Sequence, residues 1–361
     1  MRVTIVGGGL AGLSCAAELA RAGADVTVLE AGARFGGQVR TTRESGFIVE
    51  DGAATMDAGG EAVRLCATEL GLADKVVERR NLPTLVLLNG ALDRLRAGET
   101  AALFGLPDRT IEGAPPVALR PGMDALAQAI MSQVDGHVEG LNGTRAVALG
   151  RVNGEWRVYP EVGTAIAADA LVLALPPRLA AWLLHPVSPA PARALSVLSA
   201  RTVIVVSLGF TRDAVAHPLD ATGFTVPRRP TEPGLHSCAF ASSQFTHCAP
   251  ADSVLLRAVI RPGRGELAGT TETQWQERAL RLLAPVLGIR GKPLGAWVAR
   301  WTEALPDYGP GYEERIRDAR AALEAVGPVV VAGAAYDGWG IDGALRSGRE
   351  AAAKLLDRRA G

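Results

Sequence analysis

Residues 2–30 read RVTIVGGGLAGLSCAAELARAGADVTVLE. The pattern predicts a buried strand at Arg2–Val6, a helix rich in Ala and Leu at Leu13–Ala22 that ends at Gly23, and a second strand at Ala24–Leu29. Strand, helix and strand in this order form a parallel βαβ unit. The fold class that follows is α/β.

The turn between the first strand and the helix has the pattern G-x-G-x-x-G. Gly7 permits a tight turn, Gly9 lets the backbone approach a pyrophosphate, and Gly12 lets helix and strand pack closely. The helix N-terminus adds free N–H groups and a positive dipole end. Glu30 ends the second strand, where an acid accepts hydrogen bonds from a ribose diol and disfavours the 2′-phosphate of NADP. With all four features in register, the stretch predicts a dinucleotide site.

Composition argues against several classes of protein. The 38 basic and 38 acidic residues give a formal net charge of zero, so we expect no nucleic-acid partner. The four cysteines show no C-x-x-C pair and no zinc or disulfide spacing, which predicts reduced thiols, no metal and a cytoplasmic location. The chain shows no signal peptide and no apolar run of roughly 18 residues, so we expect no stable membrane insertion.

The residues after Glu30 favour FAD over NAD. Residues 31–41 read AGARFGGQVRT, and R-x-G-G-x-x-x-T after such a glutamate resembles the second dinucleotide signature of the FAD-dependent amine oxidase superfamily. The resemblance implies FAD as cofactor, with Arg34, Gly36, Gly37 and Arg40 near its pyrophosphate and flavin edge. It also implies a Rossmann-like FAD-binding lobe of the GR2 type and a smaller α+β substrate lobe built on a mixed or antiparallel sheet.

Within the superfamily, the chain most resembles the protoporphyrinogen oxidases. The stretches that carry the resemblance are GFIVEDG at 46–52, LRPGMDAL at 119–126, WTEALPDY at 301–308 and VAGAAYDGWGI at 331–341. The family implies a flavin oxidase acting on a tetrapyrrole such as protoporphyrinogen IX or coproporphyrinogen III, with O₂ as acceptor. The positions assigned to FAD are Gly7, Gly9, Leu10, Ala11, Gly12, Glu30, Ala31, Arg34, Gly36, Gly37, Gln38, Arg40, Gly333, Gly340, Ile341 and Ala344.

The C-terminal stretch also predicts structure without the resemblance. Pro328–Ala332 is a continuous apolar run, typical of a buried strand, and a helix is expected from about Gly343 to Arg358. We expect the FAD-binding lobe to collect residues 1–80, 120–182 and 300–361. The substrate lobe then collects 81–119 and 183–299.

The chain departs from the family at the expected substrate pocket. A long helical insertion of the family is replaced by a short loop at Arg94–Val117. The pocket is therefore expected to be more open, or to be closed by a homo-oligomer or a partner subunit. Thr84 stands where the family often has an arginine that meets a propionate. Arg79 and Arg80 either compensate or are surface charges. Val205 stands where many amine oxidases place a lysine near flavin N5.

Because the flavin does the chemistry, the protein side chains are candidates for lining the pocket rather than for catalysis. Tyr336 and Trp339 either touch the ring or pack in the core, and His236 and His247 are more typical of structural histidines than of bases. The departures leave two alternatives open: an FAD oxidase or desaturase of another small molecule in specialised metabolism, or a flavoprotein subunit that needs a partner. The pocket candidates are Thr84, Phe240, Phe245, Tyr336 and Trp339.

Overall fold

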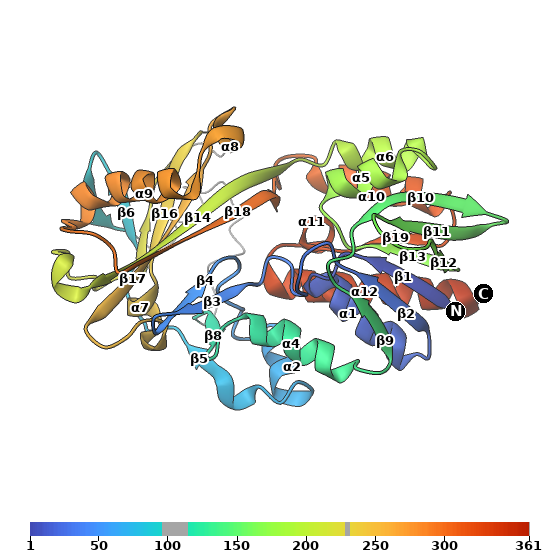
Figure 1. Cartoon of the computed structure of the whole chain (residues 1–361), viewed down its shortest axis with the longest axis horizontal. Coiled ribbons are helices and arrows are strands. Elements are labelled where there is room, and N and C mark those ends of the chain that lie inside the picture. The colour runs from blue at the N-terminus through green and yellow to red at the C-terminus, as the bar shows by residue number, and fades with distance from the viewer. Residues whose placement is uncertain (96–114, 228–231, 361) are drawn as a thin grey trace.

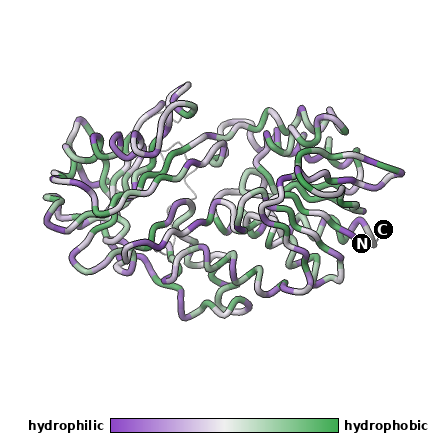
Figure 2. Tube along the Cα trace, in the orientation of Figure 1, coloured by the Kyte–Doolittle hydropathy of each residue, from purple (hydrophilic) through white to green (hydrophobic). Residues whose placement is uncertain are grey.

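The computed structural model describes residues 1–95, 115–227 and 232–360, and it shows two sheets separated along the long axis of the molecule (Figure 1). Most of the loop expected at Arg94–Val117 falls outside the described residues. The mixed α/β architecture confirms the predicted fold class. The division into two lobes at the residues given above stays a prediction. Hydrophobic residues run along the strands of both sheets (Figure 2).

The first sheet is parallel, with strand order β19-β13-β1-β2-β9. Its first strand forms at the predicted residues, and its last strand is one residue shorter at each end than Pro328–Ala332. The strands are β1 (Arg2–Val6), β2 (Asp25–Leu29), β9 (Val138–Leu141), β13 (Ala170–Leu173) and β19 (Val329–Val331).

Two helices cover one face of the parallel sheet. Helix α1 (Leu10–Arg21) begins three residues before the predicted Leu13, and Gly23 has the positive φ expected of a residue that ends a helix. Helix α12 (Gly340–Ala360) includes the predicted Gly343–Arg358 and follows the short helix α11 (Ala334–Asp337). Buried side chains of α1 and α12 share a hydrophobic cluster with β1, β2, β13 and β19.

The opposite face packs against a smaller sheet and three helices. The cluster between them is centred on the buried Trp156 and Leu173. The elements are β10 (Ala146–Val152), β11 (Glu155–Pro160), β12 (Ile166–Ala168), α5 (Pro177–Leu184), α6 (Pro189–Ser196) and α10 (Tyr312–Glu324).

The second large sheet has seven strands in the order β18-β14-β17-β16-β15-β6-β7. All neighbours are antiparallel except β15 and β6. Its strands are β6 (Leu85–Leu88), β7 (Ala91–Arg94), β14 (Ala200–Thr211), β15 (Gly223–Thr225), β16 (Gly234–Phe240), β17 (Ser253–Arg261) and β18 (Gly295–Pro306).

Helix α9 (Glu272–Leu287) covers one face of this sheet. A capping box starts the helix: Thr271 Oγ1 accepts from the backbone N–H of Gln274, and Gln274 Oε1 accepts from the backbone N–H of Thr271. The buried Trp275 and Leu283 anchor the helix on the sheet. The other face is directed toward the segments that join the two sheets.

A third group of elements fills the middle of the molecule around the buried Phe47 and Met123. No helix in the described part of the chain is long and apolar enough to cross a membrane. All four cysteines are buried and free of disulfides. The remaining elements are β3 (Thr41–Glu44), β4 (Phe47–Glu50), α2 (Glu61–Thr68), η1 (Ala73–Lys75), β5 (Val76–Glu78), β8 (Val117–Leu119), α4 (Asp124–Gln133), η3 (Arg212–Ala214), α7 (Ala241–Gln244), η4 (Thr246–Cys248) and α8 (Glu266–Gly269).

Candidate functional site

The glycine turn after β1 leaves space where a pyrophosphate would lie. A Cβ on Gly7, whose φ is +109°, would fall 2.2 Å from the carbonyl oxygen of Ala174, and one on Gly12 would fall 2.0 Å from that of Gly7. A Cβ on Gly9 would meet only the Cα of Gly37, at 3.8 Å. Gly7 and Gly12 are therefore required for packing, whereas Gly9 faces open space.

Helix α1 begins directly after Gly9, and no side chain caps it. Its first turn, which includes Leu10 and Ala11, carries no acidic residue. The first N–H groups of a helix have no partner within the helix, and the dipole places positive charge there. An anion is the natural partner of such an end.

The carboxylate of Glu30 is fixed by two backbone donors. Gly8 N–H donates to Oε2 over 2.9 Å, and Gly32 N–H donates to Oε1 over 2.7 Å. Each carboxylate oxygen can accept a second hydrogen bond, so the group can still receive ribose hydroxyls. Ala31 follows at the end of β2, in the bend between these two contacts.

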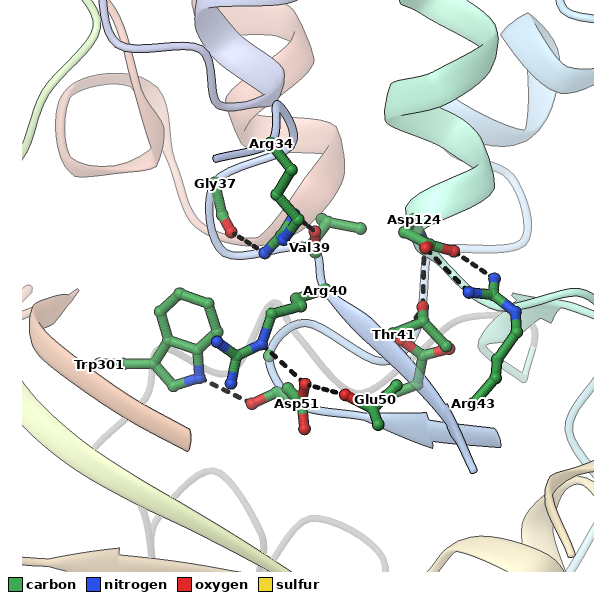
Figure 3. Close-up of polar contacts among 12 residues, drawn as sticks. Arg34, Gly37, Val39, Arg40, Thr41, Arg43, Glu50, Asp51, Asp124 and Trp301 are labelled. Carbon is green, nitrogen blue, oxygen red and sulfur yellow. Dashed lines mark hydrogen bonds and ion pairs between the residues drawn. The ribbon is translucent and has the colours of Figure 1, made fainter. Parts of the chain in front are cut away.

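Arg34 holds the signature loop in shape. Its Nη1 donates to the carbonyl oxygens of Phe35 and Val39, and its Nη2 donates to that of Gly37 (Figure 3). Burial lowers the pKa of this guanidinium. Because its donors are used within the loop, we assign Arg34 a positioning role. The backbone of Gly36 then pairs with the glycine turn, where its N–H donates to the Gly8 carbonyl over 2.8 Å.

Arg40 joins two distant sequence stretches through Asp51. Its Nε lies 2.7 Å from Asp51 Oδ2, and its guanidinium lies over the ring of Trp301, 5.3 Å from the centroid (Figure 3). Trp301 Nε1 donates to the Asp51 backbone carbonyl over 2.7 Å. Arg40 is 38% exposed, and its terminal nitrogens have no hydrogen-bond partner among the described residues. Those nitrogens remain available to an oxyanion.

Gln38 links the same loop to β18, since its Nε2 donates to the Ala304 carbonyl over 3.2 Å. Its own carbonyl fits tightly against the G-x-x-x-E-x-G stretch. A Cβ on Gly52 would fall 1.8 Å from that oxygen. The predicted FAD signature and the two further family stretches are therefore in direct contact.

Glu50 is a half-buried acid whose role sequence reasoning missed. Its Oε1 accepts from the Met123 N–H and its Oε2 accepts from the Thr41 hydroxyl, both at 2.9 Å. Burial raises the pKa of this carboxyl to about 7, although both hydrogen bonds favour the charged form. Asp124 forms an ion pair with Arg43 in the same place (Figure 3). These contacts fix the start of α4 to the β3–β4 hairpin.

The C-terminal motif folds back on the parallel sheet. Gly333 has a φ of +143°, and its N–H donates to Ser347 Oγ over 2.8 Å. Asp337 binds both Ser347 and Arg320. Gly340 begins α12, Ile341 is buried in the central cluster, and Ala344 is half-buried beside it.

The two aromatic residues of this motif lie in different environments. Tyr336 is buried in the cluster that contains Leu173, and its hydroxyl donates to the Leu175 carbonyl over 2.9 Å. Burial raises the pKa of this phenol. Tyr336 is therefore a packing residue. Trp339 is 58% exposed and does not pack in the core.

The structure corrects the assignment of Phe240 to the pocket. This residue is fully buried beneath α9, where it packs against Phe224 and His217. A register shift in β16 between Leu235 and Ser237 reverses the alternation that a regular strand would give. Phe240 therefore faces the cluster beneath α9 and not the expected pocket.

The remaining pocket candidates lie apart. Thr84 Oγ1 and Thr222 Oγ1 are 2.8 Å apart and share a hydrogen bond. Phe245 lines a cavity of about 380 Å³ together with Arg80, Arg120 and His247. Burial lowers the pKa of His247.

The remaining polar candidates, His236 and Arg79, do not form a metal site. His236 Nε2 lies 3.0 Å from the Glu232 carbonyl. Among the described residues, no cluster of three His, Cys, Asp or Glu could hold a metal. Arg79 is half-buried, and its Nε has no hydrogen-bond partner in the part of the chain that the structure describes.

The fold and the site define a dinucleotide-binding protein whose turn, helix end, ribose acid and partly exposed arginine suit FAD. The sequence profile of the flavin containing amine oxidoreductase family matches residues 10–104 and 83–356. The chain belongs to this family, and its cofactor is FAD.

Several curated relatives are named as oxidases of tetrapyrroles. The chain is 27% identical over 241 residues to coproporphyrinogen III oxidase of Bacillus subtilis, covering 66% of this chain and 50% of that protein. It is 31% identical to coproporphyrinogen III oxidase of Propionibacterium freudenreichii, covering 66% and 44%. It is 30% identical to human protoporphyrinogen oxidase, covering 66% and 51%. The chain thus spans about half the length of the curated relatives it matches.

Solved structures share the fold over nearly the whole chain. A candidate protoporphyrinogen oxidase from Exiguobacterium sp. 255-15 superposes with a TM-score of 0.85 at 24% identity, covering 99% of both chains. A variant of putrescine oxidase superposes with a TM-score of 0.74 at 17% identity, covering 99% and 100%. These similarities establish the two-sheet flavoprotein fold.

Proposed function

We propose that this protein is an FAD-dependent oxidase that removes hydride equivalents from a tetrapyrrole, protoporphyrinogen IX or coproporphyrinogen III, with O₂ as acceptor. The observation that carries the proposal is the Asp51 contact set. It brings two stretches that resemble the protoporphyrinogen oxidases, at Asp51 and Trp301, together with the superfamily signature at Arg40. The names of the relatives at 27–31% identity support the same substrate class.

The protein holds the cofactor and orients the substrate. FAD, when bound, supplies the acceptor of two electrons. Gly9 and the start of α1 would receive its pyrophosphate, Glu30 its adenosine ribose, and Arg40 an oxyanion near the signature loop. We assign these residues to binding and no side chain to acid–base catalysis.

The sheet face opposite α9 suits an apolar substrate better than an amine. Val205 pairs with Val259 and Ala299 across three strands of this face. Apolar side chains exclude water from this face. With valine at position 205, no lysine amine is available there to act as a base. The three lysines of the chain, Lys75, Lys292 and Lys354, all lie outside the described strands. This favours the tetrapyrrole over an amine substrate.

A second candidate is a flavoprotein subunit whose pocket is closed by a homo-oligomer or another protein in the cytoplasm. It is favoured by the chain's spanning about half the length of its curated relatives. Light scattering coupled to gel filtration tests it. A monomer that turns over substrate alone would contradict this candidate, whereas activity only in an oligomer or with an added partner would support it.

Anaerobic mixing with each porphyrinogen tests the main proposal. Bleaching of flavin absorbance, restored by air as porphyrin fluorescence appears, is the expected result. A yellow protein that neither porphyrinogen bleaches would contradict the substrate and favour another small molecule, a reading that Thr84 also favours. A colourless protein would contradict FAD binding. Gly9→Val serves as the control for spontaneous oxidation of the porphyrinogens, because its added side chain would fill the pyrophosphate space.

A further inference from the structure

Strand β17 presents two arginines on the face opposite α9. Val254, Leu256, Ala258 and Ile260 alternate along the strand and pack in the cluster beneath α9. Side chains of a strand alternate between faces, so the intervening residues lie on the other side. Leu255 confirms this, because it packs in the central cluster. Arg257, Val259 and Arg261 share its face.

Arg257 has a structural task that uses its donors. Its Nε donates to the Glu50 carbonyl over 2.9 Å, and its Nη2 donates to the Gly52 carbonyl. These bonds attach the seven-stranded sheet to the G-x-x-x-E-x-G stretch. The charge of Arg257 is therefore placed against backbone carbonyls of this chain.

Arg261, four residues later on the same face, has no such partner. Its Nε and Nη1 are buried and have no hydrogen-bond partner among the described residues. Burial and, to a smaller extent, the nearby charge of Arg201 lower the pKa of this guanidinium to about 10. Buried donors without acceptors are costly and rare in native proteins. The guanidinium of Arg261 therefore needs a hydrogen-bond acceptor from outside the described residues.

The charges around Arg261 leave a net positive site. Arg201 forms an ion pair with Asp307, where the ends of β14 and β18 meet. Two arginines and one aspartate sum to a charge of +1 at neutral pH. A single carboxylate would neutralise the group and provide the missing acceptor.

The position of Arg261 also suits a peripheral carboxylate of a large substrate. Val259 pairs with Val205, and Arg261 follows Val259 by two residues on the same face, about 7 Å along the strand. Val205 is buried, so a tetrapyrrole on this face would contact Val259, the partly exposed member of the pair, and would have its peripheral carboxylates at that range. The macrocycle needs an apolar surface, and its carboxylate substituents need a cation at the edge of that surface.

We propose that Arg261, supported by Arg201, is a subsite for a carboxylate of the substrate. The inference rests on the proposed tetrapyrrole oxidation and gives it a specificity-determining residue. It differs from the position that the resemblance implied, because Thr84 directly precedes β6, which lies three strands away from β17 in the sheet. The chemical class that the subsite takes is a carboxylate-bearing macrocycle.

Binding of coproporphyrin III and of its tetramethyl ester tests the subsite without turnover. Quenching of porphyrin fluorescence gives the dissociation constant of each compound. We expect the wild-type holoprotein to prefer the acid by about tenfold or more, as a hydrogen bond to a charged group implies. Arg261→Gln should abolish the preference, Arg261→Lys should restore part of it, and the exposed Arg264→Gln should leave it unchanged.

Each outcome decides the subsite separately from the proposed reaction. Equal affinity of the wild type for acid and ester, or a preference that survives in Arg261→Gln with a normal melting temperature, would overturn the subsite. Lack of binding of either compound would overturn it as well. A preference that depends on Arg261, in a protein whose flavin no porphyrinogen bleaches, would support the anion subsite and contradict the proposed reaction.

Discussion

Gly348 of α12 crosses Ala11 of α1 so closely that a Cβ at 348 would fall 2.2 Å from the Ala11 carbonyl oxygen. The crossing is completed by Ser14, whose hydroxyl donates to the Leu345 carbonyl over 2.9 Å. The helix that offers its N-terminus to the cofactor is therefore held in place by the last helix described. The packing of α12 sets the position of the pyrophosphate site.

Gly348→Ala should destabilise the protein, because the methyl group forces α1 and α12 apart. The expected loss of unfolding free energy is about 1–3 kcal/mol, typical of overpacking. Chemical denaturation measures it. Gly269→Ala is the matched control, since a Cβ there meets nothing within 4 Å. A Gly348→Ala protein as stable as this control would contradict the close crossing.

Gly9→Ala should reduce FAD affinity with little effect on folding. Its methyl group would enter the space beside Gly37 rather than a packed interior, and that space is where we place the pyrophosphate. We expect a loss of about tenfold or more, or 1.4 kcal/mol. Titration of the apoprotein with FAD gives the affinity, and circular dichroism checks the fold. Gly7→Ala, which clashes with Ala174, should instead impair folding itself.

Arg40→Met should cost stability because it leaves the Asp51 carboxylate, 4% exposed, without its cation. We expect a loss of about 1–3 kcal/mol, below that of a fully buried pair because Arg40 is partly exposed. Asp51→Asn on the Arg40→Met background should recover part of it. Denaturation of the two single variants and the double variant gives the coupling energy. Strictly additive losses would mean that the pair is not coupled.

Glu50 should make stability fall as pH rises toward neutral. Its folded-state pKa is about 7, above the usual 4.5, so the folded protein holds the proton more tightly than the unfolded chain. The contribution is complete below pH 4.5 and is lost as pH rises through about 7, with a size of about 2–4 kcal/mol. Glu50→Gln should flatten unfolding free energy between pH 5 and 8. The exposed Glu161→Gln should keep the wild-type slope.

The βαβ unit could be predicted because its signals are local. Gly7, Gly9 and Gly12 fix the turn, and the flanking strands formed where the apolar runs lie. The start of α1 was placed three residues late, because the last glycine of the motif was assigned to the turn. In the structure Gly12 already lies in the helix, close to the Gly7 carbonyl.

Features that depend on pairing between distant segments could not be predicted. The face on which Phe240 lies depends on a register shift within β16, and no residue of that strand signals the shift in the sequence. The pKa of Glu50 depends on burial beneath α4 and on the Met123 N–H. Arg261 resembles any strand-end arginine until the sheet places Arg201 beside it.

The order of strands in the parallel sheet has a consequence for biosynthesis. β1 lies in the middle of the sheet, while β19, the last of its strands to leave the ribosome, completes one edge. The nascent chain therefore exposes the apolar faces of α1 and β13 until residues near 330–355 emerge. Such long-range closure is slow and leaves partly folded intermediates open to aggregation. Cofactor capture is thus expected only after residues near 330–355 have emerged, and supply of FAD at that moment should raise the yield of folded protein.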